Sequence, residues 1–253
     1  MKKKDLQYEL QIKQLERNYI QFMGIENFPK YNLELYEIRV DETDQKGFGA
    51  IAQAMYDPKS GKHTLRICKN LELKKYVVFH EFTHILDSEM YAKKDSLRYA
   101  YLSGYTEYHA SQVELLVLLG AQSHLEIVTD KTINSVIPTF PSEKTVLDYL
   151  LTKHQFVVDM MQRRGFPESI EALKTTLGAL YNYWGLRSIC KMYLKDYVEK
   201  VDNSEIIDIL PLQLFSVMNS FMDGWFDDSK VEMSFGPYSN ALIPILKEKK
   251  LLE

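Results

Sequence analysis

The first part of the chain combines one helical pattern with several short extended patterns. Over residues 4–23, apolar side chains recur at helical spacing among Lys, Glu and Gln, which predicts an amphipathic helix. Residues 32–40 carry mostly alternating apolar positions and predict a strand, followed by a polar, turn-rich segment at 41–49. Two more extended runs, 50–56 and 63–68, flank the turn sequence Asp-Pro-Lys-Ser-Gly-Lys, so we expect them to form a hairpin.

Two long helices are predicted after the hairpin. The first spans about 71–90, and the second begins near Ser103 or Thr106, which are both good N-cap residues. From about residue 126 onward the strand patterns stop, so we expect the C-terminal half to be all helical.

The C-terminal half divides into several helical stretches. Ser142 is predicted to cap a helix that Gly165 ends, and the next helical stretch covers 168–200, where Gly178 and Gly185 are expected to interrupt it. Two shorter features follow, a helix at 211–222 and a turn at 236–237.

Composition and charge narrow the class of protein. Of the 253 residues, 45% are hydrophobic and 26% are charged, which is the balance of an ordinary globular protein. The formal net charge is -4, so there is no electrostatic reason to expect nucleic acid or a membrane as partner. Cys68 and Cys190 cannot make a disulfide framework, and the opening Met-Lys-Lys-Lys lacks the apolar core of a signal peptide. We therefore expect a cytoplasmic protein, and the sequence leaves its oligomeric state open.

Residues His80 to His84 read HEFTH, an HExxH sequence, within the first of the two long helices. Side chains four residues apart lie one turn apart on the same helix face, so both imidazoles can point at one zinc ion. Glu81 would then lie beside the water that the ion activates, where it can take up a proton and later deliver it to the leaving amine. The pattern predicts a catalytic zinc site with His80 and His84 as ligands and Glu81 as the general base.

A catalytic zinc usually has three protein ligands and one open position, so a further side chain must complete the set. Five downstream residues are candidates: Asp87, Asp95, Glu107, His109 and Glu114. Glu107 is preferred, because the residues one turn further on, Ala110 and Ser111, are small and would let the two helices approach closely. Asp87, one turn beyond the second histidine, can either ligate or orient a ligand histidine, and Glu114 can hydrogen-bond back to the site.

Peptide hydrolysis needs two further parts, a place to hold a substrate strand and a group to stabilise the oxyanion. The hairpin at 50–68 is the candidate for the first, because Ala50, Ala52 and Ala54 would leave the backbone accessible, although an ordinary hairpin is equally compatible. For the second, Tyr105 is the best placed of the tyrosines between the two ligand helices.

The HEFTH segment, followed by a variable segment and then Thr106-Glu107-Tyr108-His109-Ala110-Ser111, resembles the gluzincin-type zinc peptidases. It is most similar to the ImmA/IrrE-like group, which is associated with bacterial mobile elements and regulators. The resemblance covers about residues 30–120. It implies an N-terminal helix, a small antiparallel sheet, the HExxH helix and a helix that carries the third-ligand Glu. It also implies cytoplasmic proteolysis of a regulatory protein.

These patterns together predict an α+β fold with a zincin-like metallopeptidase domain at 1–125 and an all-helical region at 126–253 that covers the cleft or recruits a partner. The expected function is zinc-dependent hydrolysis of peptide bonds in an intracellular protein or peptide substrate. Two alternatives stay open. The chain can be a zinc-binding module without turnover that acts in regulation, or a helical protein in which the HExxH sequence is accidental.

Overall fold

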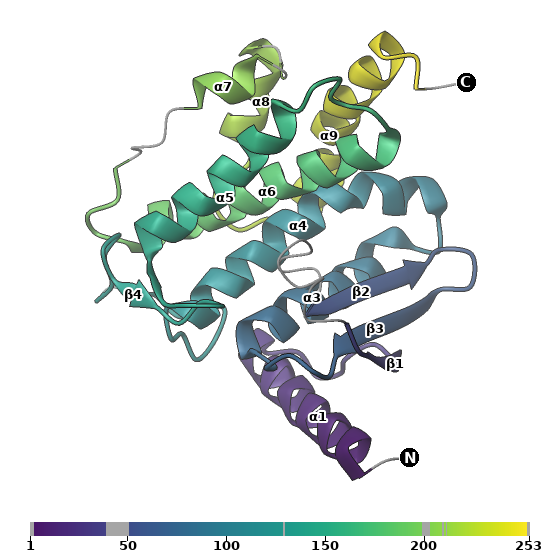
Figure 1. The fold of residues 1–253 in the computed structure, drawn as a ribbon, viewed down its shortest axis with the longest axis vertical. Helices are drawn as coiled ribbons and strands as arrows, with labels where there is room; N and C mark the ends of the chain where they lie inside the picture. The colour runs from purple at the N-terminus through teal and green to yellow at the C-terminus, as the bar shows by residue number, and fades with distance from the viewer. Residues whose placement is uncertain are drawn as a thin grey trace. The chain divides into compact units, whose positions relative to one another are not determined.

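The computed structural model describes residues 3–38, 51–128, 130–198, 203–208, 210 and 212–251 (Figure 1). Within these residues it is a mostly helical α+β structure with one three-stranded and one two-stranded sheet, which confirms the predicted α+β class. The turn-rich segment expected at 41–49 and Ala50 lie outside the described residues. No helix in the described part of the chain combines the length and the apolar character that crossing a membrane requires.

Contacts divide the chain into two compact units. Unit 1 contains residues 1–99 and 113–126, and unit 2 contains residues 100–112 and 127–253. Helix α4 (Ser96–Leu118) contributes residues to both. The domain boundary predicted near residue 125 stays a prediction.

The sheet of unit 1 has the strand order β1-β3-β2, with β1 at Tyr31–Tyr36, β2 at Ala52–Asp57 and β3 at Lys62–Cys68. Strands β2 and β3 pair antiparallel, so the predicted hairpin is confirmed. The expectation of an antiparallel sheet is wrong for β1, which pairs parallel with β3. The sequence expectation extended the antiparallel pairing of the hairpin to β1, but the β1–β3 pairing is a long-range contact that no tight turn determines.

Helices α1 (Lys3–Met23) and α3 (Lys75–Asp87) form the helical side of unit 1. The first agrees with the predicted helix at 4–23, whereas α3 begins a turn later than expected. A π-helical turn, Ser88–Ala92, follows α3 and ends in Lys93, which has a left-handed backbone at φ 52°. The chain then enters α4, whose N-cap is Asp95, accepting hydrogen bonds from two backbone N–H groups.

The observed start of α4 corrects the prediction, which placed it at Ser103 or Thr106. Both residues are good caps by type, but they lie inside the helix, because the cap at Asp95 begins it earlier. Glu107 is therefore in the middle of a long helix, where the backbone is held by hydrogen bonds on both sides.

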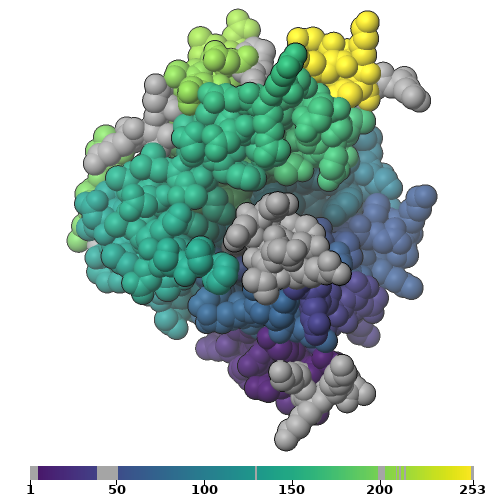
Figure 2. Space-filling model, in the orientation of Figure 1, coloured from purple at the N-terminus to yellow at the C-terminus, as the bar shows by residue number. Residues whose placement is uncertain are grey.

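Unit 2 is built around α5 (Val146–Met161) and α6 (Ile170–Tyr193). In Figure 1 α5 lies in front of α6, and in Figure 2 the teal surface around α5 forms much of the face of unit 2 that is in view. Accordingly α6 is buried along most of its length. The N-cap of α5 is Thr145, whose hydroxyl accepts the N–H of Asp148, and not the predicted Ser142.

The last part of the chain is more regular than predicted. Short helices α7 (Ser204–Ile207) and α8 (Leu212–Phe221) precede α9 (Asp228–Glu248), which runs through the expected turn at 236–237. Its two prolines remove backbone donors, but buried residues on one face stabilise the helix in spite of this cost. The all-helical expectation is also wrong in one detail, because β4 (Val136–Ile137) and β5 (Lys144–Thr145) form a small antiparallel ladder.

The glycines expected to interrupt the helix at 168–200 instead let it pack closely on α4. A Cβ atom added at Gly185 would lie 2.2 Å from the backbone oxygen of Tyr108 and 2.9 Å from the Cβ of Ser111. Ser111 therefore serves the approach of α4 to α6, and not the approach to the HExxH helix that its small size led us to expect. Glycine lowers helix propensity, but at position 185 the close packing of the two helices leaves no room for a side chain.

We predict that Gly185→Ala lowers the free energy of unfolding by about 1–3 kcal/mol, because the new methyl group would overlap a helix backbone that cannot move aside. Gly178→Ala is the matched control on the same helix, since its Cβ would meet the nearest atom at 3.5 Å, an ordinary contact. That control should gain up to about 1 kcal/mol from helix propensity. Denaturant unfolding measures both, and equal stability of the two variants would contradict the packing described here.

Candidate metal centre

Helix α3 is held from one side by an aromatic cluster. The Tyr19 ring lies edge-on to Phe79 at 5.2 Å between centroids and packs on Phe82 at 5.4 Å. The Tyr19 hydroxyl donates to Thr83 Oγ1 at 3.0 Å, and Thr83 donates in turn to the Phe79 carbonyl at 2.9 Å. These contacts all involve one face of α3, so they fix the rotation of the helix. His80 and His84 then point away from Tyr19.

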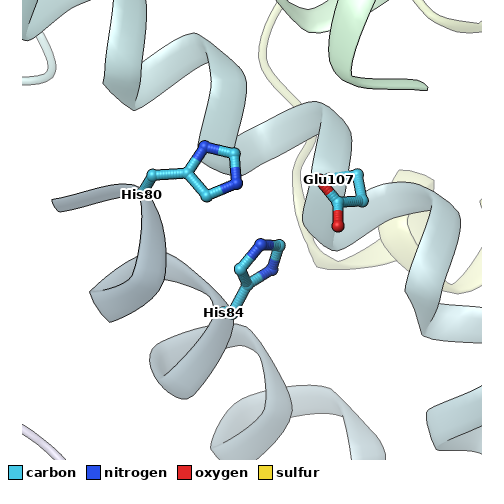
Figure 3. A group of neighbouring side chains, drawn as sticks. All are labelled: His80, His84 and Glu107. Atoms are coloured by element: carbon cyan, nitrogen blue, oxygen red, sulfur yellow. The ribbon is translucent and has the colours of Figure 1, made fainter. Parts of the chain in front are cut away.

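The two histidines of the HExxH sequence lie one turn apart as predicted. Their ring centroids are 4.8 Å apart and their planes make an angle of 76°. His80 is 3% exposed, and His84 is half-buried. Figure 3 shows both rings directed toward one space.

Glu107 reaches the same space from α4 (Figure 3). One ligand atom from each of His80, His84 and Glu107 can be chosen so that all three atoms lie within 4.8 Å of one another. It is the one such group of His, Cys, Asp or Glu found among the described residues. The structure thus brings together the two histidines and the preferred third ligand.

The arrangement fits a tetrahedral metal ion after a small adjustment. Bonds of about 2.0–2.1 Å to zinc place tetrahedral ligand atoms roughly 3.4 Å apart. The observed spacing of up to 4.8 Å is wider, and modest rotations of the side-chain torsions are enough to close it. Two imidazoles and one carboxylate are also a donor set found at catalytic zinc sites with an open position.

Glu114 supports the first histidine. Its Oε2 lies 2.8 Å from His80 Nδ1, and the Glu114 side chain is fully buried. A carboxylate at Nδ1 favours the tautomer with its proton on that nitrogen, which leaves Nε2 as the ligand atom. Since Glu107 and Glu114 are seven residues apart on one helix, α4 presents both to the site from the same face. Glu114 thus lies against the site as expected, and its hydrogen bond to His80 stays a prediction.

Glu81 is held by the edge of the sheet. Its Oε2 accepts a hydrogen bond of 2.6 Å from the backbone N–H of Ala54, and the residue is 6% exposed. The hydrogen-bond pattern of the sheet explains why the Ala54 N–H can reach Glu81. Cys68 N donates to Ile51 O, and in an antiparallel pair every second residue from Ile51 onward directs its N–H and C=O groups toward β3. Ala54 has the opposite parity, so its N–H points to the free edge of β2. One oxygen of Glu81 is engaged there, and the side chain is fixed next to His80.

The other candidates for the third ligand are not in the group of converging ligand atoms. Asp95 caps α4, as described above. Asp87 is 1% exposed on α3, and the question whether it orients a ligand stays open. The His109 ring stacks on Tyr105 with centroids 5.5 Å apart and lies edge-on to Trp225 with centroids 6.0 Å apart. His109 is thus packed among aromatic side chains.

Tyr105, predicted to stabilise the oxyanion, is packed among aromatic rings of unit 2. Its ring is 5% exposed and stacks on Phe226 at 5.5 Å between centroids. It lies two residues before Glu107, which places it on a different side of α4. Its catalytic role stays a prediction.

Tyr36 was not singled out from the sequence. Burial raises the pKa of Tyr36, the charges of Cys68 and Glu81 raise it further, and Arg66 lowers it. The Tyr36 hydroxyl is therefore within electrostatic reach of the candidate base. The sequence does not indicate that Tyr36 lies near Glu81, because its position depends on the parallel register of β1 and β3.

Comparisons with protein-family models, with curated proteins and with solved structures found no match to this chain. The assignment of function therefore depends on the geometry of the site.

We predict that Glu114→Gln weakens zinc binding by about 10–100-fold, because the substitution removes the carboxylate charge that lies 2.8 Å from His80 Nδ1 and supports this ring as a ligand. Competition with a chromophoric chelator measures the affinity. Glu89→Gln is the matched control, since Glu89 Oε2 lies 2.9 Å from His63 Nε2 in a similar pair outside the site. Equal zinc affinity in wild type, variant and control would contradict the assigned role of Glu114.

Proposed function

We propose that this protein is a zinc-dependent metallopeptidase. The observation that carries the proposal is the convergence of His80, His84 and Glu107, with Glu81 adjacent to the first ligand and directed to the edge of a sheet. A ligand set of two histidines from one helix and a glutamate from the next is the gluzincin type, and the order of elements is similar to that of the ImmA/IrrE-like group. The proposed substrate is a protein or peptide in the cytoplasm, such as a regulator.

The chemistry follows from the placement of the chain's own groups. When bound, a zinc ion would act as a Lewis acid and lower the pKa of a bound water to about 7. Glu81 receives the proton of the attacking water and delivers it to the amine that leaves. Its hydrogen bond from Ala54 fixes one oxygen of the carboxylate and limits the orientations that the base can take.

The free edge of β2 supports an extended peptide as the substrate. This strand is at the edge of the sheet, and the N–H groups of Ala52, Ala54 and Tyr56 share the outward parity. The N–H of Ala54 is bonded to Glu81, so Ala52 and Tyr56 are the donors that a peptide would use. A peptide in extended conformation can add to such an edge through backbone hydrogen bonds. The bond from Ala54 to Glu81 brings this edge next to the proposed base, so a paired peptide would pass close to the ligands.

We predict that Glu81→Gln removes at least about 99% of peptide hydrolysis, because the amide cannot take up a proton, while zinc content and stability are retained. A library of proteome-derived peptides, analysed by mass spectrometry after incubation with the zinc-loaded protein, measures cleavage. Glu89→Gln serves as the control with unchanged cleavage. If the zinc-loaded wild type cleaves no peptide, the hydrolase proposal is wrong and a zinc-binding module without turnover remains.

We predict that Ala52→Pro raises KM for a cleaved peptide several-fold with a small loss of stability, because proline removes an N–H that points away from β3 and leaves the bond between Ala54 and Glu81 in place. Met55→Pro is the contrasting variant, since its N–H has the parity that faces β3 and its loss should cost about 1–3 kcal/mol of unfolding free energy. Steady-state kinetics and denaturant unfolding measure the two effects. An unchanged KM in Ala52→Pro would argue against substrate pairing at β2.

A further inference from the structure

A polar pocket lies between the last turns of α6 and the end of α8, within unit 2. Its lining includes Arg187, Ser188 and Lys191 of α6, Asn219 of α8, and Asp223, which follows α8. The pocket has a volume of about 60 Å³, whereas one buried water needs roughly 10–15 Å³ on the same measure. It therefore has room for a small ion, and none of its lining residues belongs to the candidate metal centre.

The side-chain amide of Asn219 is held in one orientation at the wall of this pocket. Its Oδ1 accepts two hydrogen bonds of 2.9 Å, one from the Trp184 indole and one from the Arg187 guanidinium. Because both partners can only donate, the amide oxygen must face them, and Nδ2 lies on the other side of the group. In the part of the chain that the structure describes, no acceptor meets hydrogen-bond geometry with Asn219 Nδ2. The pocket wall thus carries two oriented N–H donors that can bind a ligand.

Two cations lie one turn apart on the same face of α6. Arg187 and Lys191 have the i, i+4 spacing, at which like charges destabilise a helix by about 0.2–0.5 kcal/mol. The Arg187 guanidinium lies over two rings, with its Cζ 5.6 Å from the Tyr183 centroid and 5.9 Å from the Trp184 centroid. Lys191 Nζ is 2.7 Å from Asp223 Oδ2, and these side chains are 64% and 43% exposed, so solvent weakens the pair. Two positive groups and one negative group line the pocket, which leaves one net positive charge.

We propose that this pocket binds a phosphate group. The guanidinium of Arg187, the ammonium of Lys191 and the amide of Asn219 border it from two helices. A tetrahedral phosphate has an oxygen for each of these donors, and charge-assisted hydrogen bonds to guanidinium and ammonium groups are the strong ones in proteins. The anion would also offset the repulsion between the two cations of α6. The inference does not depend on the proposed function, because the pocket shares no residue with the metal centre.

A purely structural role for the same contacts makes a different prediction. Through Asn219 and Asp223, the two cations join α6 to α8 and to the residues after it. If only this cross-link matters, Asn219→Asp keeps the acceptor oxygen and turns the contact with Arg187 into a surface ion pair. If the amide nitrogen matters, the same isosteric substitution replaces a donor by a negatively charged acceptor and prevents phosphate from binding.

The test measures binding of inorganic phosphate to the whole chain by isothermal titration calorimetry at constant ionic strength, before and after treatment with a chelator. For wild type we expect saturable binding of one phosphate in both conditions. Asn219→Asp and Arg187→Gln should each raise the dissociation constant by at least about 10-fold, because each removes a donor or a charge from the pocket. Lys195→Gln is the matched control, since Lys195 is an exposed cation after α6 that does not line the pocket, and it should match wild type.

Several outcomes would overturn the proposal. These are no phosphate binding in wild type, equal affinity in Asn219→Asp, or an equal loss in the Lys195→Gln control, which would indicate a general charge effect. Binding that disappears on chelation would place the phosphate on a metal ion instead of in the pocket, and equal affinity for acetate would contradict the assigned ligand class. Where the proposal holds, O-phosphoserine distinguishes two sources of the group: tighter binding than inorganic phosphate indicates a phosphate ester, and weaker binding indicates the free ion.

Discussion

The contact between His80 and Glu114 is the interaction on which the candidate site depends. It joins the HExxH helix to α4 through two buried side chains, 2.8 Å apart, and it selects which nitrogen of His80 is presented. Because Glu107 is on the same helix two turns earlier, the contact that orients the first histidine also sets the direction from which the third ligand arrives. The spacing of the two glutamates on α4 is therefore as much a part of the centre as the spacing of the two histidines on α3.

The glycines of α4 and α6 show how unit 2 holds its section of α4. Gly185 allows the Tyr108 carbonyl to approach α6, and Gly104 accommodates the rings of Tyr181 and Tyr238. Such contacts tolerate little movement, since interiors are packed as densely as crystals of small molecules. A helix packed in this way fixes the position and rotation of the Glu107 backbone. A residue on a loop would be held less precisely.

The local signals in the sequence were enough to select three side chains that the structure brings together and to predict several elements, and they failed where tertiary packing decides. HExxH spacing and the small hairpin follow from rules that act over four to ten residues, and the helix at 4–23 has a plain periodic pattern. The start of α4 was misplaced because Ser103 and Thr106 are caps by type only, whereas Asp95 is the cap in the structure. Helix α9 was missed because the Gly236-Pro237 pair is a strong local turn signal that buried residues such as Tyr238 and Leu242 outweigh. The parallel pairing of β1 with β3 joins segments about thirty residues apart, and no local pattern encodes such a pairing.

The burial of acidic side chains is consistent with the proposed cation site. Glu81 and Glu114 are 6% and 0% exposed, and Glu107 is half-buried beside them. Placing a carboxylate in an apolar interior costs several kcal/mol unless it is paired. A divalent ion held by His80, His84 and Glu107 would add positive charge beside the buried acidic groups. Stability and metal binding are then linked, because an ion that binds the folded state alone stabilises it in proportion to its affinity. If the proposed metal binds, the same acidic surroundings would make it a structural requirement of the fold around the site.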